Sequence, residues 1–217
     1  MKKNICVSLV VLFILACCTG VLLAKEEEQV QITVAPSFFL LDQGKLEKFN
    51  NIASENGFVP FEQKVFPGIT VTTIGKVQDK DLWFGSNTDV TWAVSESGDK
   101  TLAFTAAGVT FSLEKPVQIA QGVTTRYGGV FGWGISSVGA QFEADGNLGD
   151  QLGGAKYSQA YEIYLLAGAK AGLDYAITEK ISLTGQAQYL LPLGSWGTKD
   201  FNLPLGGPSL TVGVTFQ

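Results

Sequence analysis

The feature that most constrains the fold is a period-two alternation of apolar and small polar residues in the last third of the chain. From Tyr157 to Gln217 it forms three long segments, separated by a short turn at Thr178 and Glu179 and by a longer loop at 194–204. Such alternation is typical of β-strands whose two faces meet different surroundings. The bulky face of the first segment carries Tyr161, Ile163, Leu165, Ala167, Ala169, Ala171, Leu173 and Tyr175.

The opposite face of these strands is small and polar and carries little charge. Only 16% of the 217 residues are charged, whereas soluble domains have about 25%. Because a soluble sheet covers its outer face with Lys and Glu, the pattern predicts that the apolar face points outward to lipid. The alternative is a soluble, periplasmic, lipocalin-like barrel whose apolar face encloses a lipid or another apolar ligand. In that case Leu165, Tyr189 and Val212 would lie inside.

The N-terminus is typical of an export signal. Lys2 and Lys3 precede 20 uncharged residues that end at Ala24, and an acidic run follows. We expect a signal peptide over residues 1–24, cleaved after Ala24, and a mature domain over residues 25–217. Lipidation at Cys17 and a retained spanning helix are the alternatives.

Five further strands are expected before the final three. The fourth strand changes phase, since Leu102 and Phe104 lie on its even positions and Leu113 on an odd one, and this predicts a one-residue bulge at 106–108. Pro116 indicates a connection over 114–121. The result is an all-β, antiparallel, up-and-down barrel of about eight strands, with ten as the alternative. The additional strands are expected at 30–41, 64–77, 82–95, 102–113 and 122–142.

One segment between the first two strands has a helical period instead. Residues 42–56 predict a short amphipathic helix, with Asp42 as its N-cap and Gly57 as its stop. We expect it to cover one mouth of the barrel, while a partner-binding helix and a plug inside the lumen are alternatives. Its apolar residues are Leu46, Phe49, Ile52 and Ala53.

The glycine-rich alternating strands and the final segment 208–216 resemble those of small bacterial outer-membrane β-barrels. This superfamily includes the OmpA transmembrane domain and the OmpW-like barrels, and the resemblance covers about residues 30–217. It implies a non-enzymatic integral protein of the outer membrane, with a role in envelope structure, adhesion or passage of a small solute. It also implies outer-membrane lipid and the assembly machinery as partners. The machinery reads a terminal aromatic residue, here Phe216, which Gln217 follows.

The small-residue faces carry the candidate site residues. An eight-stranded barrel is just wide enough for side chains to fill it, and buried charges without partners are costly. We therefore expect an ion-pair network across the lumen rather than a gated conduit, with Arg126 bound to Glu162 or Asp174. The expected members are Asp89, Arg126, Glu162, Lys170 and Asp174.

Aromatic residues on the apolar faces predict two interfacial belts. Tyr161 and Tyr175 lie 14 residues apart, which is about 35 Å along the axis of a tilted barrel and matches the distance between the two membrane interfaces. The residues assigned to the belts are Tyr161, Tyr175, Trp92, Trp133 and Phe216.

The sequence predicts no catalytic, cofactor or metal site. Histidine is absent, which excludes Ser-His catalysis, and Ser112 with Lys115 matches a Ser-x-x-Lys motif by chance. The loop 145–156 lacks two residues that a calcium loop requires. Removing Lys2 and Lys3 leaves 13 basic and 20 acidic residues, a net charge of −7, so nucleic acid is not expected as a partner.

Overall fold

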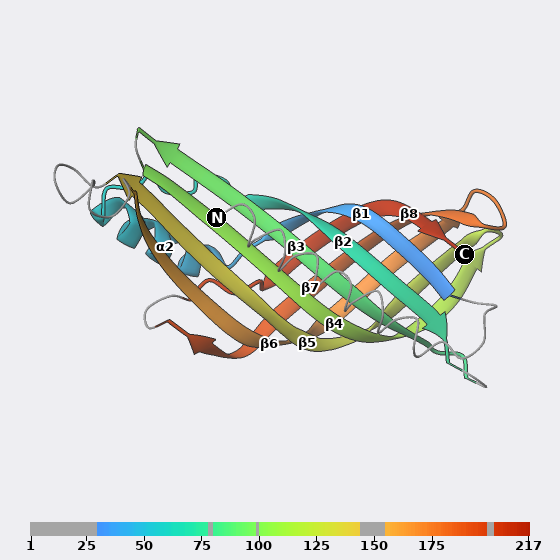
Figure 1. The fold of residues 1–217 in the computed structure, drawn as a ribbon. Helices are drawn as coiled ribbons and strands as arrows, with labels where there is room; N and C mark the ends of the chain where they lie inside the picture. Colours follow the sequence, from blue (N-terminus) through green and yellow to red (C-terminus); the bar gives the residue numbers. More distant parts are fainter. Residues whose placement is uncertain (1–29, 78–79, 99, 144–154, 199–201) are drawn as a thin grey trace.

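The chain forms one closed antiparallel β-barrel (Figure 1). The computed structural model describes residues 30–77, 80–98, 100–143, 155–198 and 202–217, so the predicted signal peptide and the alternative lipidation at Cys17 lie outside the described residues. The predicted all-β architecture with eight strands and one helix is confirmed. The elements are β1 Val30–Leu40, α2 Gln43–Glu55, β2 Val65–Lys76, β3 Trp83–Ser97, β4 Lys100–Ala120, β5 Val123–Glu143, β6 Ala155–Ala176, β7 Ile181–Gly197 and β8 Gly207–Phe216.

The strands follow one another around the barrel in chain order, and pairing of β1 with β8 closes it. Val34 lies opposite Val214, and Phe38 lies opposite Leu210. The wall is uneven: β4, β5 and β6 have 21, 21 and 22 residues, whereas β1 and β8 have 11 and 10. At about 3.3 Å per residue, the β4–β6 wall is therefore about twice as long as the wall opposite.

The two ends of the barrel carry different elements. Both chain ends of the barrel lie with the turns after β2, β4 and β6, and α2 lies at the other end (Figure 1).

The predicted connection at 114–121 is wrong: β4 continues to Ala120, and β5 begins at Val123 after a turn in which Gly122 has φ +72°. Pairing of β4 with β3 stops at Glu114, so Pro116 has a strand neighbour on one side only, where proline is tolerated.

The predicted bulge at 106–108 is also wrong. The pairing of β4 with both neighbours runs unbroken through those residues. Leu102 and Phe104 are buried on the inward face, in the same phase as the inward-facing Ser112 and Glu114. The apolar side chains change faces along β4 because the lumen changes from apolar to polar, while the backbone keeps its phase.

Helix α2 covers one mouth of the barrel, as expected. The Asp42 carboxylate accepts a hydrogen bond of 3.0 Å from the Lys45 amide, which caps the helix N-terminus. Leu46 and Ala53 are buried in the hydrophobic core of the barrel. Ile52, which the helical spacing placed on the same face, is 47% exposed.

Below α2 the lumen is filled by a cluster of apolar side chains, which we call the apolar plug. Phe61 lies 6.2 Å from Phe66 and 6.3 Å from Phe104, measured between ring centroids, and both contacts are edge-to-face. Asn50 holds Phe61 in place through hydrogen bonds to its backbone carbonyl and amide. The plug comprises Phe39, Leu41, Leu46, Ala53, Phe61, Phe66, Ala93, Leu102, Phe104, Ala106, Val130, Val138, Tyr164, Leu166, Leu190, Leu203 and Leu205.

Large apolar side chains also cover the outside of the barrel. Leu165, Tyr189 and Val212 point outward and are 37%, 52% and 46% exposed. This contradicts the lipocalin-like alternative, which requires the same side chains to line the interior. Among the described residues, no helix has the length and apolar character needed to cross a membrane.

Candidate functional site

The candidate site is the polar part of the lumen, between the apolar plug and the mouth where the chain ends lie. Its side chains point inward because the small polar residues occupy one phase of each strand, as the alternation predicts. Threonines line much of the wall and bond in pairs across adjacent strands: Thr33 with Thr215 at 2.6 Å, and Thr184 with Thr215 at 2.5 Å. These pairs satisfy hydroxyl groups that are otherwise costly to bury.

Arg126 is the centre of the charged network. Its Nε and Nη2 donate to the two carboxylate oxygens of Asp174 at 2.6 and 3.0 Å, which is the bidentate geometry typical of strong arginine–carboxylate pairs. Nη1 donates to Glu114 Oε2 at 3.3 Å. Of the two partners proposed from the sequence, Arg126 contacts Asp174 and makes no ion pair with Glu162 among the described residues.

Lys170 extends the network toward the plug. Its Nζ lies 2.7 Å from Glu114 Oε1 and donates to Asn87 Oδ1 at 3.1 Å. Lys170 and Glu114 are almost fully buried. Glu114 therefore bridges the two buried cations, and the bridge explains how both charges are accommodated inside the barrel.

Asp89 and Glu162 lie outside these ion pairs. Asp89 accepts hydrogen bonds from Thr70 at 2.6 Å and Gln188 at 3.4 Å. Neither carboxylate oxygen of Glu162 has a hydrogen-bond partner among the described residues, although the side chain is buried. The expectation that all five charged residues form ion pairs across the lumen is therefore wrong for Asp89, which accepts from neutral donors, and for Glu162.

Glu114 is a network residue that lies in the segment predicted as a connection. The prediction is wrong because Pro116 occupies an edge position within β4 and does not end the strand. The period-two alternation along the strand is the signal that identifies Glu114. If this alternation continues through Pro116, then Ser112 and Glu114 both point inward. Ser112 Oγ donates to Glu114 Oε1 at 2.7 Å.

The Ser-x-x-Lys match does not bring its two residues together. Ser112 is buried in the lumen, whereas Lys115 is exposed on the opposite face of β4. The Ser112 hydroxyl group bonds to a carboxylate, and Lys115 points away from it and does not act as its base. Among the described residues there is also no group of three or more Asp, Glu, Cys or His side chains placed to hold a metal ion.

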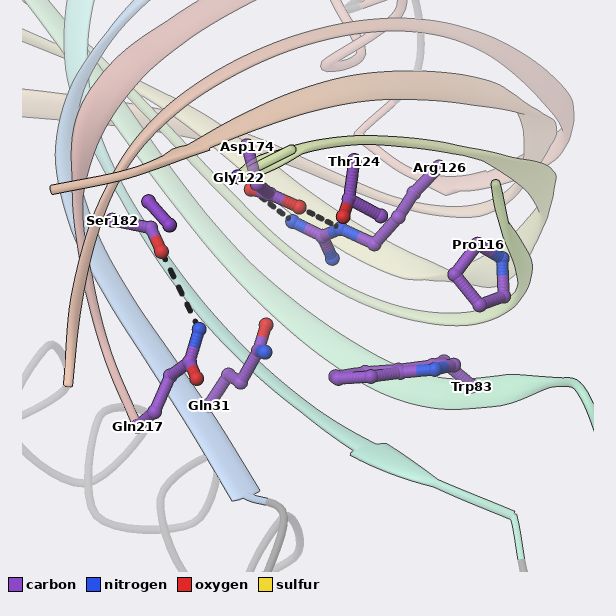
Figure 2. A pocket seen from close by; sticks show the side chains of 10 residues that line it. Gln31, Trp83, Pro116, Gly122, Thr124, Arg126, Asp174, Ser182 and Gln217 are labelled. Carbon is purple, nitrogen blue, oxygen red and sulfur yellow. Dashed lines mark hydrogen bonds and ion pairs between the residues drawn. The ribbon is translucent and has the colours of Figure 1, made fainter. Parts of the chain in front are cut away.

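A small pocket of about 130 Å³ opens at the mouth beside the chain ends (Figure 2). Arg126, Asp174 and Trp83 are among the side chains that line it. Ser182 and Gln217 also line it, and Gln217 Nε2 donates to Ser182 Oγ at 3.4 Å. The ion pair of Arg126 with Asp174 thus forms part of the lining of this pocket.

The five aromatic residues assigned to the belts all point outward. Tyr161 and Tyr175 lie toward opposite ends of β6, while Trp133 pairs with Leu165 between them. Trp92 lies on β3 and Phe216 ends β8. All five are at least 42% exposed: Trp92, Trp133, Tyr161, Tyr175 and Phe216.

Comparison with known proteins gives similarity at the level of structure. No protein-family model and no curated protein matches the chain. A major outer membrane protein from Thermus thermophilus has a similar structure, with 11% identity, 86% of this chain and 98% of that chain covered, and a TM-score of 0.54. Ail, the attachment invasion locus protein of Yersinia pestis, in complex with the heparin analogue sucrose octasulfate, has 14% identity, coverage of 87% and 95%, and a TM-score of 0.50.

At these identities the similarity shows the fold alone. In this chain that fold is a closed antiparallel barrel of eight strands with large apolar side chains on its outside. This chain therefore has the fold of the small outer-membrane β-barrels.

Proposed function

We propose that this protein is a non-enzymatic, integral barrel of the bacterial outer membrane, with a closed lumen and a role in envelope structure. It would reach that membrane after export, with residues 1–24 removed as a signal peptide. Outer-membrane lipid is its proposed partner over the apolar outer surface. During biogenesis, the assembly machinery would read the aromatic residue Phe216 near the end of β8.

The observation that supports this proposal best is the filling of the lumen. Toward the mouth with the chain ends, the ion pairs of Arg126 with Asp174 and Glu114 lie inside the lumen. From the other end, the apolar plug and α2 fill the barrel. Because an eight-stranded barrel has room for little beyond its own side chains, passage of a solute is the least supported of the three expected roles.

The outer surface supports the membrane location. A charge-poor belt of large apolar side chains is costly in water and favourable in hydrocarbon. Tyr161 and Tyr175 are proposed to lie at the two interfaces, where the ring is buried and the hydroxyl group remains hydrated. Trp92, Trp133 and Phe216 are proposed to contribute to the same belts.

Surface adhesion is a second candidate role. The barrel end that carries α2 would be the end exposed at the cell surface, because both chain ends lie at the opposite mouth. The structure of Ail with a heparin analogue concerns a protein of the same fold that is named for attachment. We extend this role to the present chain as a proposal only.

Two measurements test the main proposal. Membranes from cells that produce the full chain are washed with alkaline carbonate, and we expect the protein to stay in the pellet; release into the wash would contradict an integral location. Purified protein is then reconstituted into planar lipid bilayers, where we expect no stable conductance steps. Stable, reproducible channels in the wild-type protein would contradict the closed lumen and favour solute passage.

A further inference from the structure

Unsatisfied polar atoms in the barrel gather at one place. Both carboxylate oxygens of Glu162 are buried without a hydrogen-bond partner among the described residues. Ser136 Oγ and the Tyr164 hydroxyl group, which lie close to each other and to the Leu205 backbone, are buried there without a hydrogen bond of good geometry. The three side chains are at most 1% exposed. One more such atom, Gln188 Oε1, lies on β7, where the Gln188 amide nitrogen donates to Asp89. A native barrel leaves few buried polar atoms unpaired, so four in one place need an explanation.

These three side chains are neighbours on β5 and β6. Ser136 lies directly opposite Glu162, and Gly134 lies directly opposite Tyr164. The Tyr164 ring leans over Gly134, so closely that a Cβ atom added to that glycine would lie 2.9 Å from the Tyr164 hydroxyl oxygen. The three side chains thus converge on one region of the inner wall.

The region lies within the apolar plug, which makes the unpaired carboxylate expensive. Tyr164 and Val138, which flank Glu162 and Ser136 on their strands, belong to the plug. An ionised carboxylate in such surroundings needs a counter-charge. The cluster therefore combines a negative charge, two hydroxyl oxygens and exclusion from solvent.

Neither buried cation of the lumen can supply that counter-charge. Lys170 lies eight residues from Glu162 along β6, which is about 26 Å at 3.3 Å per residue, and it already binds Glu114. Arg126 lies farther along the wall, opposite Gly172, and binds Asp174.

We propose that Glu162, Ser136 and Tyr164 form a buried site for one hard metal cation, an alkali ion or calcium, held by oxygen atoms. Two carboxylate and two hydroxyl oxygens form a donor set that such cations accept. Softer metals are disfavoured because they prefer histidine and cysteine ligands. The chain has no histidine, and its three cysteines, Cys6, Cys17 and Cys18, lie in the predicted signal peptide. Since the site is closed to solvent, the ion would enter as the barrel folds and would stabilise the plug end. This inference does not depend on the proposed envelope role.

The test compares cations on the full chain folded into detergent micelles after removal of metals with a chelator. The temperature of heat-induced unfolding is followed by the change in gel mobility, in choline buffer alone and with Na⁺, K⁺, Mg²⁺ or Ca²⁺ present during folding. We expect at least one cation to raise this temperature by about 5 °C in a saturable way. Binding of the same ion at about one per chain should be measurable by elemental analysis of the wild-type protein.

Three variants connect the effect to the site. Glu162→Gln removes the charge and should abolish the shift, and Ser136→Ala removes one oxygen and should weaken the ion's apparent affinity about tenfold. Glu96→Gln changes an exposed carboxylate on β3 and should keep the full shift. If no cation stabilises the wild-type protein and none co-purifies with it, or if Glu162→Gln keeps the whole shift, the proposal is wrong. Should Glu162→Gln fail to fold, the metal content of the wild-type protein and of Ser136→Ala decides the question.

Discussion

Arg126 and Asp174 join β5 to β6 inside the lumen through two parallel hydrogen bonds, of 2.6 Å from Nε and 3.0 Å from Nη2. Arg126 is buried, and the Asp174 side chain is 13% exposed. Thr184 on β7 adds a hydrogen bond of 2.7 Å to the same carboxylate. Asp174 thus connects three adjacent strands at the mouth of the barrel.

Replacing this carboxylate should weaken the barrel strongly. Asp174→Asn leaves the Arg126 guanidinium with Glu114 as its remaining ion-pair partner, so we expect the free energy of unfolding to fall by about 3 kcal/mol. Urea unfolding in lipid vesicles measures it. Glu179→Gln, at an exposed position in the turn before β7, is the control and should change stability by less than about 0.5 kcal/mol. Equal effects of the two variants would show that the ion pair has no net stabilising role.

The contact between Glu114 and Lys170 is testable as a pair. Glu114→Gln leaves Lys170 buried without its carboxylate, and Lys170→Met removes one of the two cations that balance Glu114. In the double variant neither charge remains, so its loss of stability should be smaller than the sum of the single losses by about 1–3 kcal/mol. Strict additivity of the three unfolding free energies would mean that the two charges do not interact.

The apolar plug should contribute to stability through packing. Phe104 is fully buried and packs against Phe66 at 5.7 Å between ring centroids, so Phe104→Ala should cost about 3–5 kcal/mol. Phe131→Ala is the matched control, because this ring is 57% exposed on the outer surface. We expect the control to lose less in urea unfolding, because it gives up contact of the ring with hydrocarbon but leaves no cavity in a packed core. A reversed order would contradict the assignment of the inner and outer faces.

The outer face can be probed at its centre. Ala169 is exposed on β6, in the stretch between Tyr161 and Tyr175, and pairs with Gly129 on β5. In lipid vesicles Ala169→Lys should lower the unfolding free energy by about 2–4 kcal/mol, the usual cost of a lysine at the bilayer midplane. Ala169→Leu, which adds bulk without charge, should be close to neutral. If Ala169→Lys leaves the unfolding free energy unchanged, this result would argue against contact of the position with hydrocarbon.

The sequence predicted the fold well because the alternation is simple wherever the lumen is polar. Thr33 and Ser37 on β1 point inward and Val34 points outward, as their phase requires. The same reasoning failed at Leu102 and Phe104, where the lumen is also apolar and bulk no longer distinguishes the two faces. A phase change in hydrophobicity was therefore mistaken for a phase change in the backbone.

The sequence predicted which charged residues point into the lumen better than it predicted which of them bind each other. Which charges meet depends on the register between β5 and β6, and the loop that joins these strands gives no turn signal strong enough to fix that register. In the structure Arg126 lies opposite Gly172, two residues from Asp174, whereas Glu162 lies opposite Ser136. The isolation of Glu162 follows from this register.

The central claim, apolar residues facing lipid around a filled lumen, is tested most directly by fluorescence quenching with brominated lipids. Trp133 is exposed on the outer face, whereas Trp83 lines the pocket inside the mouth. Variants that keep only one of these tryptophans are reconstituted into vesicles of dibrominated phosphatidylcholine. We expect strong quenching of Trp133 and weak quenching of Trp83. Equal quenching of the two, or quenching of Trp83 alone, would contradict the proposed orientation of the barrel wall.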